Sequence, residues 1–394
     1  MFGLIPIALA LLAAAGAPEA EPTFVDAAGV GPTPVAGTPV DPAIERVPSK
    51  PGVAQGNDGS WTVFPLVSFA PETSVQGSAF VIYSFGGQPG ATPLATSSRS
   101  TVTLLAAYTL KNQFLMSLAP SLYLDQGKWR LSGSLQALWY PDVVYATGPD
   151  SSVQSAEKYT QRAFVVNASV ERRLIGHLKA GGQLLAFTAR MTKVEPGRLL
   201  DQGLLIGSHG GDGVGIGPLV VWDDRSREFA PQHGGRHMLS LMFFPRVAGA
   251  DFSFSQLTVD LRQYVPSWWS GQVIAFQLFS QFSMGDPPFQ FTPTIGGDGR
   301  MRGFFASRFR DRDTAVAQVE YRAALWWRLG LVVFGGVGDV AGRIADFHLG
   351  HFRTAGGGGL RVALDQKEGI NVRVDVGHSS VGDTNLYVTV GEGF

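Results

Sequence analysis

A loop rich in arginine and glycine is the part of this chain best suited to specific charge pairing. It reads I-G-G-D-G-R-M-R-G-F-F-A-S-R-F-R-D-R from Ile295 to Arg312, with Arg302 near its centre. A guanidinium can fork onto a carboxylate through two parallel hydrogen bonds, which fixes geometry as well as charge. The alternating segment Thr314–Leu325 that follows carries Glu320 on its polar face. Arg302 is therefore the candidate anchor of the loop. The alternative is that the loop is solvated and that its arginines have no fixed partner.

Two adjacent carboxylates, Asp223 and Asp224, open a second polar segment. Paired carboxylates can bind a metal ion or share acid–base work, but adjacent residues at a strand end point to opposite sides. The residues that follow are typical of a turn, because Asp and Pro shape turns and Gly supplies a positive φ angle. We therefore interpret the segment as structural, and its candidate residues are Asp223, Asp224, Arg225, Phe229, Pro231 and Gly234.

His348 and His351 have a spacing that could hold a metal ion. The sequence offers no third ligand beside them, so a place on the surface is the preferred interpretation. The chain has no Cys, which excludes a Cys-ligated zinc site and a disulfide scaffold. It also has no phosphate-binding loop, dinucleotide fingerprint or nucleophile elbow. We predict no enzyme activity, no metal and no cofactor, and the net charge of −1 gives no bulk electrostatic case for nucleic acid.

The elements that must position these residues are β-strands. From Trp61 onward, apolar and polar residues alternate between regular turn signals. Most segments have the length to cross a bilayer, for which about 9–11 tilted residues are enough. The sixteen predicted strands are Trp61–Phe69, Val75–Phe85, Arg99–Thr109, Gln113–Leu124, Lys128–Tyr140, Thr160–Arg172, His177–Arg190, Val214–Trp222, Arg236–Pro245, Phe252–Val265, Gln272–Met284, Thr314–Leu325, Arg328–Val337, Phe352–Leu364, Ile370–Gly377 and Thr384–Phe394.

The composition is typical of a transmembrane β-barrel. Only 16% of the residues are charged, against roughly 25% in soluble domains. Mean hydropathy is a modest +0.10, which fits lipid-facing apolar residues that alternate with a polar interior. A soluble secreted β-protein is the alternative, because its strands also alternate, with the apolar face inward. The strand Ile370–Gly377 has a clear apolar face and a clear charged face, but the sequence does not tell which one is inside.

Two segments precede the predicted barrel domain of residues 61–394. Residues 1–20 contain an apolar run followed by small residues, which is typical of a secretory signal peptide. That run is too short to span a membrane as a helix, which needs about 20 apolar residues. Residues 21–60 are rich in proline, which fixes φ and lacks a hydrogen-bond donor. We predict that they form an extended or disordered linker.

The ordered set of these features resembles one family. Met301-Arg302-Gly303-Phe304 in a long loop, Glu320 in the next strand and a final Phe394 are similar to the BamA/TamA outer-membrane assembly superfamily, also called bacterial surface antigens. The resemblance implies an all-β, sixteen-stranded antiparallel barrel in the outer membrane of a Gram-negative bacterium. It implies that the long loop folds into the lumen, where Arg302 pairs with Glu320. The segment from Asp223 to Gly235 looks like the periplasmic turn of the family, and Phe394 looks like its C-terminal signal for membrane insertion.

Two positions depart from the family pattern, and the first is Met301, where the family usually has a β-branched residue. The resemblance implies a second acidic partner for Arg302 in the strand after Glu320, within a pattern like F-x-D-x-G. The corresponding stretch is Phe334–Gly338, where Gly336 occupies the place of the Asp. Asp339 is a candidate substitute, although its side chain points to the opposite side of the strand.

The resemblance implies a role in the insertion or export of a client. Outer-membrane lipid and an unfolded client protein would then be the partners. Large relatives carry periplasmic POTRA modules ahead of the barrel, and the Pro-rich linker is too short to hold one, so a full insertase role does not follow. The alternative is a passive solute or lipid conduit. A weak seam between the first and last strands would favour the assembly role.

Overall fold

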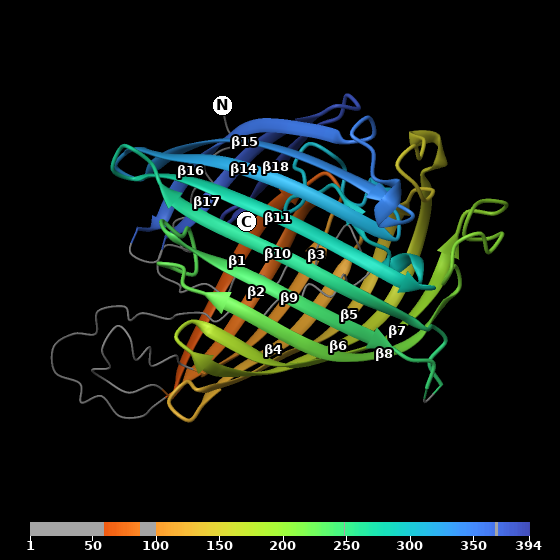
Figure 1. Ribbon diagram of the computed structural model, residues 1–394, viewed down its shortest axis with the longest axis horizontal. Helices are drawn as coiled ribbons and strands as arrows, with labels where there is room; N and C mark the ends of the chain where they lie inside the picture. Colours follow the sequence, from red (N-terminus) through yellow and green to blue (C-terminus); the bar gives the residue numbers. More distant parts are fainter. Residues whose placement is uncertain (1–58, 87–99, 248, 367–368) are drawn as a thin grey trace.

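The computed structural model describes residues 59–86, 100–247, 249–366 and 369–394. Sixteen strands close into one antiparallel barrel in the order β1-β18-β17-β16-β15-β14-β11-β10-β9-β8-β7-β6-β5-β4-β3-β2 (Figure 1). The predicted fold class is confirmed. The expected signal peptide and almost all of the expected linker lie outside the described residues. Within the described ranges, no helical segment is long and apolar enough to cross a membrane.

The first eight barrel strands are β1 Ser60–Ala70, β2 Ser74–Phe85, β3 Ser100–Thr109, β4 Phe114–Leu124, β5 Trp129–Val144, β6 Glu157–Ile175, β7 Leu178–Val194 and β8 Gly210–Asp223. The other eight are β9 Gly234–Phe244, β10 Phe254–Pro266, β11 Gln272–Gly285, β14 Asp313–Trp326, β15 Leu329–Ala341, β16 Arg353–Asp365, β17 Ile370–Ser379 and β18 Thr384–Val390. The loop between β11 and β14 contains a short hairpin of β12 Thr294–Ile295 and β13 Phe309–Arg310. Short 3-10 helices lie at Val153–Ser155, Phe289–Phe291 and Ile344–Asp346.

Every predicted strand overlaps an observed one, and the differences lie at strand ends. β8 begins at Gly210, earlier than predicted. Its first glycines do not form a turn but belong to the strand, where they leave space for aromatic rings. A Cβ atom on Gly213 would lie 2.3 Å from the ring of Phe187. The last strand ends at Val390 instead of Phe394, because Gly391 adopts a φ of +92° and turns the chain inward.

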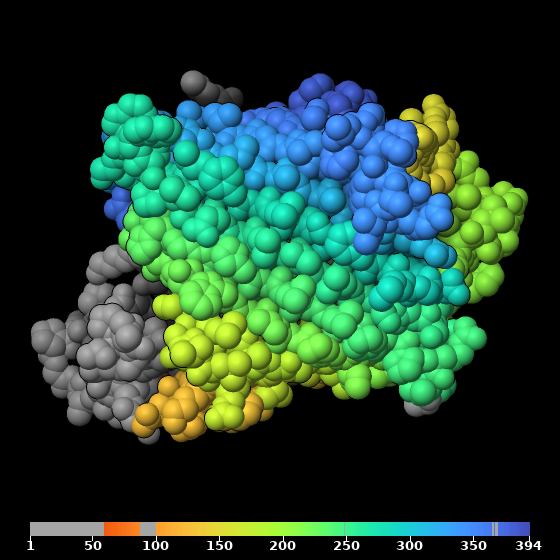
Figure 2. All heavy atoms as spheres, in the orientation of Figure 1, coloured from red at the N-terminus to blue at the C-terminus, as the bar shows by residue number. Residues whose placement is uncertain are grey.

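The exposure of side chains shows which face of the wall is inside. On β17, Val374 and Val376 are 38% and 46% exposed, whereas Arg373 and Asp375 are 3% and 0% exposed. Apolar residues therefore face outward and charged residues inward, the reverse of a soluble sandwich. The soluble alternative is excluded on this ground. Figure 2 shows part of the outer face as a continuous surface of side chains over β9 to β16.

The expected polar interior is found on part of the inner wall, and another part is apolar. A buried apolar cluster includes Phe64 on β1, Phe80 on β2 and Leu185 on β7. Phe187, Phe244 and Phe254 surround Phe291 of the long loop, with ring centroids 4.3, 5.7 and 5.8 Å from that of Phe291. This part of the wall is apolar because it packs against the loop.

The connections divide the barrel into two unlike ends. The long connections after β5, β7, β11 and β15 share one end, which we call the loop end. The opposite end, which we call the terminal end, holds the start of β1 and the end of β18, since the number of strands is even. The connection from residue 224 to residue 233 is long although it lies at the terminal end.

Candidate functional site

Arg302 lies inside the barrel with its side chain only 1% exposed. Its guanidinium pairs with Glu320 on β14 and with Asp375 on β17. It also stacks on the ring of Phe334, with its central carbon 3.8 Å from the ring centroid. The structure thus brings Arg302 and Glu320 together, as the resemblance implied, and ties the loop to two separate parts of the wall.

The second acidic partner was expected on β15, and that prediction is wrong. A Cβ atom on Gly336 would lie 3.2 Å from Cγ of Gln318 and would touch the Met301 sulfur at 3.5 Å, so an aspartate side chain there would have little room beside the loop. Among the described residues, Arg302 forms its ion pairs with Glu320 and Asp375 and not with Asp339. Asp339 has the outward parity that the sequence indicated, since it is opposite Ala315. Asp375 takes this role from β17, within the sequence R-V-D-V-G. That D-x-G pattern was the signal that could have revealed it.

Backbone hydrogen bonds complete the anchorage of the motif. The amide of Met301 donates to Gln318 Oε1 at 2.9 Å. Tyr387 on β18 accepts from the amide of Gly303 at 3.2 Å, and its hydroxyl donates to the carbonyl of Phe304 at 3.1 Å. Gly303 has a φ of +119°, a region that favours glycine. Both the side chain of Arg302 and the backbone beside it are therefore held by the wall.

The wall itself must approach the motif closely. A Cβ atom on Gly377 would lie 2.7 Å from the backbone of Arg302, closer than real Cβ contacts. Asn385 Nδ2 donates to the carbonyl of Gly303 at 2.8 Å on the neighbouring strand. Glycine at position 377 is thus a requirement of the docked loop.

The pair belongs to a larger charged network, which we call the lock. Arg322 donates to Glu320 at 2.7 Å, and Arg361 donates to Glu392 at 2.8 Å and also pairs with Asp375. Positive and negative groups balance, so the buried charges are compensated. The members of the lock are Arg302, Arg322, Arg361, Arg373, Asp298, Glu320, Asp375 and Glu392. Sequence reasoning also missed Asp298, Arg361, Arg373 and Glu392 as members of the lock. For Arg361 and Arg373, the local sign is their place on the polar face of their strands.

Phe394 lies in the lumen, 8% exposed, against Tyr264, Val273 and Ala275. Its carbonyl oxygen accepts a hydrogen bond of 2.8 Å from Arg322 of the lock. The residue expected as an insertion signal is thus part of the interior of the folded barrel. A signal role before folding stays a prediction.

The segment expected to be a turn connects β8 and β9 at the terminal end. Arg225 donates to both oxygens of Asp223 at 2.9 and 3.0 Å and to the carbonyl of Glu228 at 3.1 Å. Asp224 accepts from the amide of Gly235 at 2.8 Å. Burial lowers the pKa of Arg225, but the hydrogen bonds and charge of Asp223 outweigh it and raise the pKa above its usual range. This guanidinium therefore stays charged.

The remaining residues of the turn give it its shape. Gly234 has a φ of +87°, and a Cβ atom there would lie 2.2 Å from the carbonyl oxygen of Asp224. Phe229 and Pro231 are buried, and Phe229 packs in the same cluster as Ile370 at the start of β17. The turn thus reaches over the terminal end toward the β16–β17 connection.

Arg225→Ala is expected to lower the free energy of unfolding by about 1–3 kcal/mol, because it leaves the Asp223 carboxylate without its forked partner. Denaturant titration of the purified barrel measures this change. Arg227→Ala is the matched control, since Arg227 in the same turn makes one long hydrogen bond, 3.3 Å, to the carbonyl of Gln366. Equal losses in the two variants would show that the fork contributes nothing specific.

His348 and His351 lie in the connection between β15 and β16, with ring centroids 5.8 Å apart. No group of three or more metal-ligating side chains occurs in the described part of the chain.

The seam between β1 and β18 is the weakest junction of the wall. These strands share a single position in register, Phe69 opposite Val388. On the other side, β1 pairs with β2 along its whole length, from Ser60 opposite Ser84 to Ala70 opposite Ser74. Each ladder hydrogen bond contributes about 0.5–1.5 kcal/mol. The hydrogen bonds between β1 and β18 therefore stabilise the wall much less than those between β1 and β2.

A family model described as the Omp85 superfamily domain matches residues 112–364. The chain belongs to the Omp85 superfamily. The match runs from the start of β4 to the end of β16 and so includes the turn, Arg302 and Glu320. Omp85 proteins are non-enzymatic protein insertion and secretion factors of the Gram-negative outer membrane.

Solved structures support the same Omp85 fold. BamA from Haemophilus ducreyi lacking POTRA domains 1–3 is similar with a TM-score of 0.60 and 12% identity, over 86% of this chain and 70% of that one. CdiB from Escherichia coli is similar with a TM-score of 0.57 and 12% identity, over 84% of this chain and 63% of that one. CdiB from Acinetobacter baumannii gives 0.54 and 12%, over 85% and 65%. The chain thus spans less than two thirds of each CdiB structure. A comparison with curated sequences finds no match.

As an Omp85 barrel, the protein is expected to migrate faster on detergent gels when unheated than after boiling. The closed ladder of strands resists detergent at room temperature and opens on heating, which lengthens the particle. Gel electrophoresis of the membrane fraction measures the shift. Recovery in the soluble periplasmic fraction without any shift would contradict the membrane assignment.

Proposed function

We propose that this barrel assists the insertion or export of a client protein through the seam between β1 and β18. Outer-membrane lipid and an unfolded client are then its partners. The lock holds the long loop inside the barrel while the seam remains free to open. The proposal deepens the family assignment, which supports an insertion or secretion role without naming a client.

The single register position at the seam carries this proposal. A strand edge with few partners leaves backbone N–H and C=O groups without hydrogen bonds. In lipid, each hydrogen bond that such a group forms lowers the free energy by several kcal/mol. A client strand could provide these partners by pairing along β1. The complete ladder between β1 and β2 would stay in place and guide the added strand.

The filled lumen favours this role over the passive conduit. The long loop is fixed to the polar wall by Arg302 and to the apolar wall by Phe291, so it crosses the interior. At the loop end it meets two other connections: the amide of Gly148 donates to the carbonyl of Arg310, and the amide of Phe289 donates to the carbonyl of Ile206. These bonds narrow the path that a solute would need.

Reconstitution tests the proposal. Vesicles that contain the protein should accelerate the folding of an urea-unfolded small outer-membrane barrel, as compared with empty vesicles, and should not swell faster in an osmotic assay with small sugars. No acceleration together with fast swelling would support the conduit and contradict the assembly role.

A further inference from the structure

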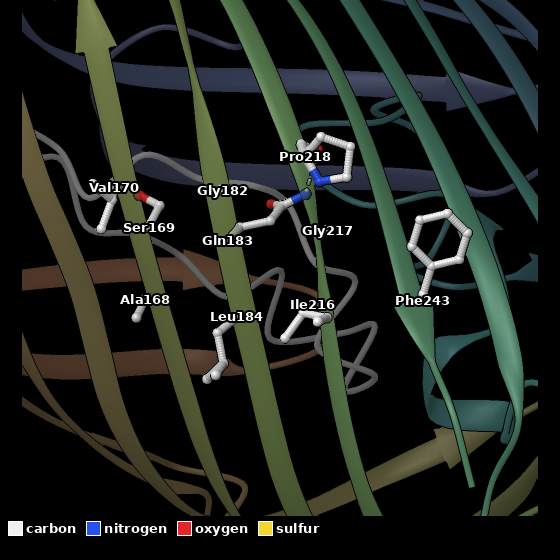
Figure 3. Close-up of a pocket in the computed structure, with 10 residues that line it drawn as sticks. All are labelled: Ala168, Ser169, Val170, Gly182, Gln183, Leu184, Ile216, Gly217, Pro218 and Phe243. Carbon is white, nitrogen blue, oxygen red and sulfur yellow. Dashed lines mark hydrogen bonds between the residues drawn. The ribbon is translucent and has the colours of Figure 1, made fainter. Parts of the chain in front are cut away.

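A hollow lies on the outer face of the wall where β6, β7, β8 and β9 run side by side (Figure 3). Its volume is about 610 Å³. The apolar side chains around it come from alternate, outward-facing positions and belong to Ala168, Val170, Leu184, Ile216, Pro218 and Phe243.

The hollow arises because small residues interrupt a belt of large ones. Gly182 on β7 has no side chain, and a Cβ atom there would meet only the carbonyl oxygen of Gly217, at 3.9 Å. Its partner on β6 is Val170, and the next outward residue of β6, Ala168 opposite Leu184, is also small. Leu184, Ile216 and Phe243 are 38%, 57% and 45% exposed and form the rim. The missing volume is therefore built into the sequence of adjacent strands.

The chemistry of the lining suits a hydrocarbon chain. Ser169 and Gln183 are the polar side chains among the lining residues, and both bond elsewhere. Ser169 Oγ lies 2.7 Å from Ser132 Oγ, and Gln183 bonds to Ser240 and to the carbonyl of Pro218. A peptide or a lipid headgroup would find few side-chain hydrogen-bond partners here. A hydrocarbon chain would instead make van der Waals contacts with the apolar side chains of the rim.

We propose that this hollow seats one acyl chain of a phospholipid. The outer face of the barrel already contacts lipid, so the hollow continues an established interface. Gly182 is near the terminal end of β7, which begins at Leu178, whereas Phe243 is near the loop end of β9, which ends at Phe244. The hollow therefore lies across the middle of the lipid-facing belt. The proposal does not depend on the proposed function.

The hollow is far from the seam. β8 and β9 lie opposite β1 and β18 in the strand order, with the same number of strands on either path around the barrel. A lipid seated here would therefore be separable from opening of the seam. Effects on lipid binding and on client folding can thus be measured independently.

Photocrosslinking tests the proposal. The full chain is reconstituted in phosphatidylcholine vesicles doped with a phosphatidylcholine that carries a diazirine on one acyl chain, and adducts are mapped by mass spectrometry. We expect adducts on Val170, Leu184, Ile216 and Phe243 to exceed several-fold those on outward residues elsewhere in the belt. Gly182→Phe should fill the hollow and bring these adducts down to the level of the rest of the belt.

Gly77→Phe is the matched control, because Gly77 faces outward on β2 and a Cβ atom there meets nothing within 4 Å. It should leave the adducts at the hollow unchanged. Adducts spread evenly over the belt of the unmodified protein, or equal before and after Gly182→Phe, would overturn the proposal. If Gly182→Phe does not fold, Ala168→Leu fills the hollow from β6, and the map of the unmodified protein still decides.

Discussion

Arg302→Ala is expected to free the long loop from the wall while the barrel stays closed. Amide exchange in residues 296–310 should become about tenfold to about 100-fold faster, which hydrogen–deuterium exchange with mass spectrometry measures. The strand ladders that close the barrel do not include Arg302, so the mobility of an unheated sample on gels should not change.

The size of this effect follows from the partners that remain. Glu320 keeps Arg322, and Asp375 keeps Arg361 and Arg373. The substitution therefore removes the hydrogen bonds of one charged group, about 1.5–3 kcal/mol, and does not leave a buried carboxylate alone, which would cost about 3–5 kcal/mol. A factor of ten corresponds to about 1.4 kcal/mol, which gives the expected range of exchange rates.

Two further variants separate the lock from a general effect on the loop. Arg312→Ala removes an arginine of the same loop whose ion pair with Asp286 is long, 3.6 Å, and exposed, so it should change little. Gly377→Ala keeps every charge but forces a Cβ atom against the backbone of Arg302. It should release the loop as Arg302→Ala does. If the loop amides exchange equally fast in the Arg302→Ala and Arg312→Ala variants, the lock does not hold the loop.

The fold could be predicted from the sequence because a barrel wall has a local code. A period of two repeats in each strand, and turn residues separate the strands, so Ile370–Ser379 could be recognised without knowledge of its neighbours. The orientation of the faces could not, since alternation is the same in a barrel and in a sandwich. The three-dimensional structure is needed to show which face is inside, because there Val374 is exposed and Asp375 is buried.

The site was predictable in part for the same reason. Arg302 and Glu320 are eighteen residues apart and belong to a loop and the strand that follows it. Asp375 is 73 residues from Arg302, and its role depends on the path that the loop takes across the lumen. The apolar inner wall was missed for a similar reason: Phe187 and Phe244 meet Phe291 only because the loop is folded inward. Contacts between residues far apart in the chain produce no periodic pattern in the sequence, so these contacts could not be predicted from it.

Crosslinking the seam is expected to abolish assembly activity. Phe69 and Val388 are direct partners in an antiparallel pair, so their Cα atoms are about 4.5–5.5 Å apart, within the range that a disulfide spans. The variant with Phe69→Cys and Val388→Cys should fold, because outward positions in lipid accept small residues. The chain has no native Cys, so no other disulfide competes. Folding of the client in the vesicle assay should fall to the rate of empty vesicles after oxidation and recover after reduction.

The matched control places the same crosslink where no opening is needed. Val67 and Gly77 are partners in the complete β1–β2 ladder, and Val67→Cys with Gly77→Cys should therefore leave the activity unchanged. Both crosslinks constrain β1, so a loss in the seam variant alone assigns the activity to separation of β1 from β18. The disulfide would keep β1 and β18 together even when the few hydrogen bonds of the seam break. Full activity in the oxidised seam variant would therefore mean that the client does not pass between these strands, and the filled lumen would have to be considered again as the route.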